Sequence, residues 1–242
     1  MNKASNPFLK YSWIILQFLL FSMSIGFIVA GVKRGIDLTD EGGFILSITN
    51  TQMYRGGIYN YHIIIYQIVP EFLHNLIGLR WVSILFTQLS ALVLSFGVFR
   101  WLKAMGKSGI ASYSKWIVGC FIGLGIMLIY FPGIAVVNNN VLINCILVIC
   151  SGMILYLYSL PPAQPNTFKW VIPLLLLGFM SAFSFFIKFP VGVMQLGLYS
   201  LAMLFHLSTE GFKAALTSVG VILIGLLIGL LTYFIAFQSF GE

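Results

Sequence analysis

Long apolar runs separated by short polar or basic turns dominate this chain. About 20 consecutive apolar residues are needed for a helix to cross the hydrocarbon core of a membrane. On that criterion the pattern predicts spans near residues 11–32, 81–99, 116–137, 141–160, 170–187, 189–207 and 214–237. The block 170–207 is interrupted only at Lys188-Phe-Pro190. A straight helix over this block would reach about 57 Å, nearly twice the hydrocarbon thickness, so we expect the chain to turn back there.

The stretch 33–79 does not follow this pattern. Between residues 41 and 54 apolar side chains alternate with polar ones, as is typical of a helix lying in the membrane interface. The run from Ile63 to Val69 ends before Pro70 and is too short to cross, which favours an interfacial or re-entrant segment. The predicted fold class is an all-α integral membrane protein. It would have about seven transmembrane helices plus interfacial helices in a long first outer loop, in one module over residues 1–242.

Composition excludes several classes of function. With 60% hydrophobic and 8% charged residues, the chain is not an ordinary soluble domain. Its 13 basic residues give a net charge of +7 but are scattered between apolar runs, so we expect no nucleic-acid partner. The cysteines and histidines lack metal-ligand spacing, and no metal site is predicted. Glycines at GxxxG spacing, Gly119 with Gly123 and Gly225 with Gly229, predict close helix contacts.

The charges of the loops predict an orientation. One set of loops carries eight basic residues and one acid, whereas the other carries five basic and five acidic residues. Because cytoplasmic loops are enriched in Lys and Arg, the N-terminus is predicted to be cytoplasmic and residues 33–79 to lie outside.

This orientation gathers the unusual polar residues on the outer side of the membrane. They are Asp40, Glu41, His62, Arg80, Asn140, Asn144 and Lys188. Together they describe carboxylates, two cations and amide groups at one membrane surface, a combination that suits a pyrophosphate- or phosphate-linked lipid. Asn144 lies one helical turn from Asn140 and therefore on the same face.

Each of these residues also has a purely structural explanation. Asp40 could cap a short helix with Glu41 in its first turn. The Arg80 side chain could snorkel to the membrane surface, and Lys188 could simply end a helix. The asparagines could form a turn, and His62 could belong to an interfacial aromatic cluster.

Four motifs, taken in chain order, resemble a known family. They are Thr39-Asp40-Glu41-Gly42, Leu79-Arg80-Trp81-Val-Ser83, Asn140-Val-Leu142, and the glycine-containing run from Gly178 that ends in Lys188-Phe-Pro190-Val-Gly192. The chain resembles the N-terminal half of the multi-span, C-type glycosyltransferases, which take sugars from polyprenyl phosphates. Protein O-mannosyltransferases and bacterial aminoarabinose transferases belong to this family.

The resemblance implies a mechanism. Asp40 would act as the general base on an acceptor hydroxyl or would orient it, with Glu41 beside it. Lys188 and Arg80 would hold the donor phosphate as its negative charge develops. The candidates for an acceptor or sugar pocket are Asn140, Asn144 and His62. The implied partners are membrane lipid and a polyprenyl-phosphate-sugar donor, and the implied location is a bacterial plasma membrane.

Because the resemblance covers about half of a usual family member, it also implies a missing C-terminal half or a partner subunit. Two other interpretations stay open at this point. One is a polytopic transporter or lipid-handling protein without catalysis, which would use the same cations for lipid head groups. The other is a truncated, inactive remnant.

Overall fold

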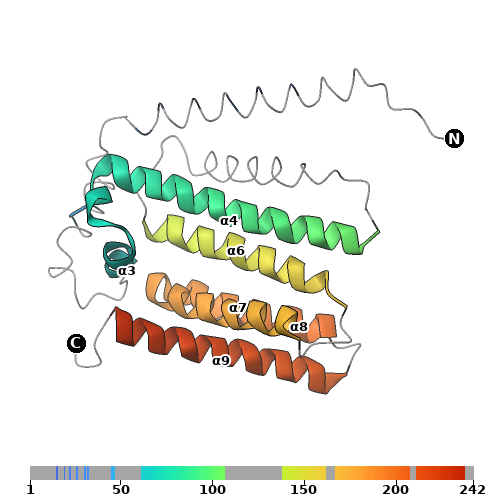
Figure 1. Cartoon of the computed structure of the whole chain (residues 1–242). Coiled ribbons are helices and arrows are strands. Elements are labelled where there is room, and N and C mark those ends of the chain that lie inside the picture. The colour runs from blue at the N-terminus through green and yellow to red at the C-terminus, as the bar shows by residue number, and fades with distance from the viewer. Residues whose placement is uncertain are drawn as a thin grey trace.

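The structure is a computed structural model that describes residues 61–106, 138–161, 167–207 and 211–237, together with the single positions 15, 19, 22, 26, 30, 32, 45 and 46. The elements in the continuous ranges are α3 (Tyr61–Ile68), η2 (Glu71–Leu73), α4 (Leu76–Ala104), α6 (Asn139–Tyr158), α7 (Phe168–Ile187), α8 (Phe189–Leu207) and α9 (Phe212–Ala236). All of them are helices, and α4, α6, α7, α8 and α9 are long and apolar enough to cross a membrane. The described part is therefore that of an all-helical membrane protein (Figure 1).

Five of the predicted spans each fall on a described helix. The bounds of α8 are those predicted, and the bounds of α6, α7 and α9 lie within about two residues of the prediction. α4 is longer than predicted at both ends. The spans predicted at 11–32 and 116–137, and the interfacial helix at 41–54, fall outside the continuous described ranges. The total of about seven transmembrane helices therefore stays a prediction.

Two short elements precede the first long helix. α3 has eight residues and would extend about 12 Å, so it is too short to cross a membrane. Its Ile64 and Ile65 side chains are buried in the apolar core. η2 then leads into α4, whose N-terminus is capped by the Asn75 side chain, with Oδ1 accepting from the Gly78 N–H at 2.9 Å.

Glycines bring two pairs of helices into close contact. In the pair α4 and α6, a Cβ added to Gly97 would overlap the Gly152 carbonyl. In the pair α7 and α9, a Cβ on Gly178 would overlap the Ile222 carbonyl, and one on Gly225 would overlap the Leu175 carbonyl. Small residues allow such backbone approach between membrane helices. The close contact predicted for Gly225 and Gly229 is confirmed, whereas Gly119 and Gly123 lie outside the described residues.

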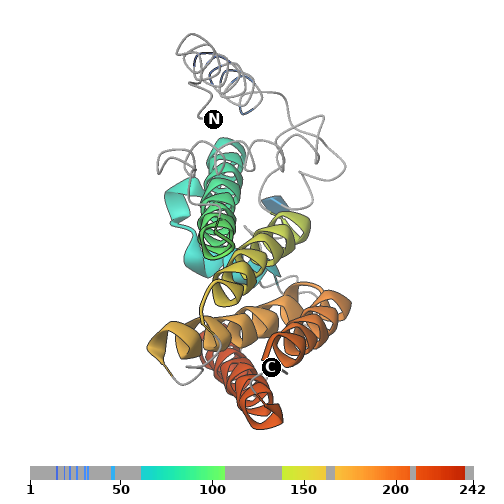
Figure 2. The same cartoon turned by 90° about the vertical axis from the view of Figure 1, so that its right-hand side faces the viewer.

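Contacts along the helices fix their directions. Thr87 Oγ1 lies 3.9 Å from Cys145 Sγ while Gly97 meets Gly152, so α4 and α6 run parallel. Gly178 meets Ile222 while the Phe186 ring stacks on Tyr233, so α7 and α9 also run parallel. Figure 2 shows α4 and α6 stacked above α7, α8 and α9.

The two ends of the bundle can now be named. α4, α6 and α8 begin, and α7 and α9 finish, at the end that carries Lys188, here called the Lys188 end. α3 lies at the same end, beside the start of α4 (Figure 1). At the opposite end the Tyr158 ring stacks on His206, and we call it the His206 end.

Candidate functional site at the Lys188 end

Lys188 forms the corner between two membrane helices. Its backbone is extended, with φ −150° and ψ 93°, so α7 stops at Ile187. The corner remains hydrogen-bonded, because the Lys188 N–H donates to the Ser184 carbonyl at 2.8 Å and its carbonyl accepts from Val191 at 3.0 Å. Pro190 lies in the first turn of α8, where its missing N–H costs little. The turn predicted from the Lys188-Phe-Pro190 interruption is thus confirmed.

The Lys188 side chain reaches across to α6. Its ammonium nitrogen donates a hydrogen bond to Asn140 Oδ1 at 2.5 Å. Two of the predicted site residues, 48 positions apart in sequence, are therefore in direct contact. Lys188 therefore does more than end α7, because its side chain also hydrogen-bonds to α6.

The asparagines at the start of α6 have different surroundings. Asn138 is buried and caps the helix, its Oδ1 accepting from the Asn140 N–H at 2.9 Å and the Val141 N–H at 3.0 Å. Asn138 therefore fits the alternative in which the asparagines only form a turn. Asn140 is half-buried and has its side chain on Lys188, and Asn144 is half-buried one turn further along α6.

Arg80 is 0% exposed, although it lies in the second turn of α4. Its Nη1 donates to the Val32 carbonyl at 2.8 Å, which ties α4 to the end of the predicted first span. A snorkelling arginine would keep its guanidinium in water, so full burial does not fit that alternative. The Val32 contact holds the guanidinium inside the protein, and phosphate binding by Arg80 stays a prediction.

Three predicted site residues cannot be placed at the Lys188 end from the structure. Asp40 and Glu41 lie outside the described residues. His62 belongs to α3, at this end of the bundle, but its side chain is likewise outside the described part. The acid–base half of the predicted site therefore stays a prediction.

The electrostatic character of the described site is positive. Lys188 is held by a neutral amide, and no described carboxylate forms an ion pair with it. The only acid in the continuous ranges is Glu71, which is exposed on η2. This arrangement can bind an anion and can stabilise a developing negative charge. It cannot by itself accept a proton from an attacking hydroxyl.

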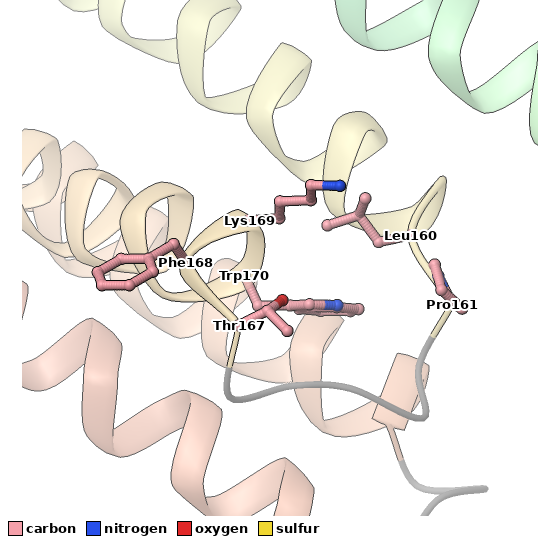
Figure 3. A pocket seen from close by; sticks show the side chains of 6 residues that line it. All are labelled: Leu160, Pro161, Thr167, Phe168, Lys169 and Trp170. Atoms are coloured by element: carbon pink, nitrogen blue, oxygen red, sulfur yellow. The ribbon is translucent and has the colours of Figure 1, made fainter.

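The His206 end holds groups that sequence reasoning missed. The Tyr158 and His206 ring centroids are 4.1 Å apart, and the Trp170 and His206 centroids 5.8 Å. Beside them is a pocket of about 350 Å³, lined by Leu160, Pro161, Thr167, Phe168, Lys169 and Trp170 (Figure 3). A lysine next to a tryptophan at a helix end is the usual pattern of a membrane interface.

A second set of missed residues lies inside the bundle. Gln195, Tyr199 and Cys150 are all buried, and Tyr199 lies beside the Cys150 thiol. The available sequence signal was Gln195, an amide in the middle of the apolar run 189–207. No group of three His, Cys, Asp or Glu side chains in the described ranges could hold a metal ion.

Comparison of the chain with protein-family models, with curated protein sequences and with solved structures gives no match. The resemblance to C-type glycosyltransferases therefore rests on the motifs in the sequence alone.

Proposed function

We propose that this chain is a membrane glycosyltransferase module that transfers a sugar from a polyprenyl-phosphate-linked donor to an acceptor hydroxyl at the outer membrane face. The observation that carries the proposal is the contact between Lys188 and Asn140. It places an ammonium group with no described acidic partner at the end of the bundle where α4, α6 and α8 begin.

The chemistry of the donor explains why such a lysine is useful. When the sugar leaves a phosphate-linked lipid, negative charge develops on the phosphate oxygens. A fixed cation in a water-poor site stabilises that charge without having to reorganise. Asn140 fixes the ammonium through a neutral acceptor, so the positive charge of Lys188 is not cancelled.

The remaining roles follow from the family resemblance. Asp40 is the general base or orients the acceptor hydroxyl, and Glu41 assists it. Arg80 is a second phosphate ligand once its side chain leaves the Val32 carbonyl. Asn144 and His62 line the acceptor or sugar pocket.

Binding of a polyprenyl phosphate to the purified protein in detergent tests the cation site. Lys188→Gln should lower affinity at least about tenfold, equivalent to about 1.4 kcal/mol, while Lys188→Arg should keep part of it. Lys169→Gln is the matched control, because it removes the same charge at the His206 end. Equal affinity of Lys188→Gln and the parent protein, or an equal loss in Lys169→Gln, would remove the proposed site.

A transfer assay tests catalysis separately. In membranes that transfer sugar when this chain is present, Asp40→Asn should abolish transfer yet retain donor binding, since asparagine caps a helix about as well as aspartate. Glu41→Gln should have a smaller effect. Lys188-dependent lipid binding in membranes that show no transfer would instead favour a non-catalytic, lipid-handling protein.

A further inference from the structure

Three side-chain contacts connect α6 with α8 and with the Lys188 corner that precedes it, and we call this region the α6/α8 junction. At the Lys188 end Lys188 bonds to Asn140, and at the His206 end the Tyr158 hydroxyl donates to the Ala202 carbonyl at 3.0 Å. Between them Tyr199 lies beside the Cys150 thiol. The order of these contacts along both segments shows that α6 and α8 are parallel.

Gln195 lies on α8 between Gly192, which packs on Phe185 of α7, and Tyr199, which lies beside Cys150 of α6. It shares a face of α8 with Gly192 and Tyr199, because residues three or four apart are neighbours on a helix. Its side chain is 1% exposed, and neither its amide nitrogen nor its amide oxygen has a hydrogen-bond partner in the described structure. The neighbouring Tyr199 hydroxyl has only a thiol beside it, which is a weak partner.

Several buried hydroxyl side chains in the bundle form hydrogen bonds within their own helix. Thr87 donates to the Ser83 carbonyl at 2.8 Å, and Ser181 donates to the Leu177 carbonyl at 2.8 Å. A hydroxyl can form such a bond within its own helix, so its burial costs little. An amide buried without partners pays the full cost of leaving water, and this cost is larger in lipid surroundings. Such a group indicates that a polar partner which is not among the described residues belongs there.

The chemistry of the junction restricts that partner. An amide is neutral and both donates and accepts hydrogen bonds, as does a hydroxyl group. Lys188 is the one charged residue among the described residues of the junction. Gln195 lies about 10 Å along α8 from Lys188, and Asn144 on the facing α6 lies at an intermediate height. A sugar joined to a phosphate at Lys188 would bring hydroxyls to this level.

We propose that Gln195, with Asn144 from the facing helix, binds hydroxyl groups of the sugar on the lipid whose phosphate Lys188 holds. This inference rests on the proposed function, because it requires the phosphate at Lys188. It adds a sugar-recognising residue that the motif resemblance does not contain. The amide has no hydrogen-bond partner among the described residues, and sugar binding would supply the missing hydrogen bonds.

The test measures the affinity of the parent protein and of Gln195→Leu for two ligands. One is a polyprenyl phosphate, and the other is the same lipid carrying a hexose. Leucine fills a similar volume without polar atoms, so the thermal midpoint of the variant should stay the same or rise by about 2–4 °C. Affinity for the hexose-bearing lipid should fall about tenfold, and affinity for the sugar-free lipid should not change. Gln67→Leu, the same change on the exposed surface of α3, is the control and should affect neither.

Each contrary outcome has its own meaning. Unchanged affinity of Gln195→Leu for both lipids would show that water fills the junction and would overturn the proposal. An equal loss for both lipids would assign Gln195 a structural role and would also overturn it. A parent protein that binds neither lipid would remove the phosphate site at Lys188, and the inference with it.

Discussion

The α7 and α9 pair and the α6/α8 junction are both contacts between parallel helices, yet they are built from different side chains. Between α7 and α9, Gly178 and Gly225 bring the backbones together, and Phe186 stacks on Tyr233 with 3.4 Å between ring centroids. The α6/α8 junction instead has polar contacts at both ends, and the Gln195 amide on α8 has no hydrogen-bond partner among the described residues. The contact between α7 and α9 is closely packed. The α6/α8 junction contains buried polar groups, which lower the stability of a membrane protein. That loss is the physical reason to place ligand binding in the junction.

Substitution of Gly178 is expected to have the largest effect on stability. A side chain at this position falls on the Ile222 carbonyl of α9, so α7 and α9 must move apart. Gly178→Leu should lower the free energy of unfolding by more than about 3 kcal/mol, the upper part of the range for overpacked cores. Thermal unfolding in detergent measures this loss.

Gly197→Leu is the matched control for Gly178→Leu. Gly197 is on the exposed side of α8, and an added Cβ has no atom within 4 Å in the described structure. Leucine there replaces a poor helix former, so stability should stay the same or rise by up to about 1 kcal/mol. Equal losses in the two variants would show that the glycine contact does not hold α7 to α9.

Asn140→Asp changes the junction without adding bulk. The new carboxylate would accept from Lys188 where the amide oxygen does now. A hydrogen bond between two charged groups is stronger, so the free energy of unfolding should rise by about 1 kcal/mol. The same pairing neutralises the site, and affinity for polyprenyl phosphate should fall about tenfold or more.

Asn144→Asp provides the comparison for Asn140→Asp, because Lys188 hydrogen-bonds to Asn140 and not to Asn144. Its carboxylate has no such partner, so this variant should lose stability instead of gaining it. Unchanged lipid affinity in Asn140→Asp would show that the charge of Lys188 does not attract the ligand.

Features that depend on residues close together in the sequence could be predicted from the sequence. The length of each apolar run predicted the bounds of α8, and the interruption at Lys188-Phe-Pro190 predicted the corner. The charge pattern placed Asn140 and Lys188 at one membrane surface. Their direct contact could not be predicted, because it depends on how α6 and α8 are rotated about their axes.

Two other residues show what could not be predicted from the sequence. Phosphate binding by Arg80 stays a prediction, and its hydrogen bond to the Val32 carbonyl could not be foreseen because the two residues are 48 positions apart. A single glutamine in an apolar run, such as Gln195, is only a weak signal in the sequence. Gln195 becomes informative only when its burial and its lack of described partners are known.

Tyr158→Phe should have the smallest effect, and it separates the two ends of the junction. The substitution removes one hydrogen bond to the Ala202 carbonyl and keeps the ring that stacks on His206. A carbonyl within a helix also accepts the regular helix bond, so Ala202 is not left without a partner. The expected loss in the free energy of unfolding is therefore about 0.5–1.5 kcal/mol.

The affinity of Tyr158→Phe for polyprenyl phosphate should equal that of the parent protein, because the lost hydroxyl lies at the His206 end. Tyr156→Phe is the control for stability. The Tyr156 ring stacks on Phe96, and its hydroxyl has no hydrogen bond to a described residue, so its removal should cost less. Since α6 and α8 are each continuous helices, a distortion at Tyr158 could reach Lys188 only by shifting a whole helix. A loss of lipid affinity as large as that of Lys188→Gln would reveal such a shift and would show that the junction responds as one unit.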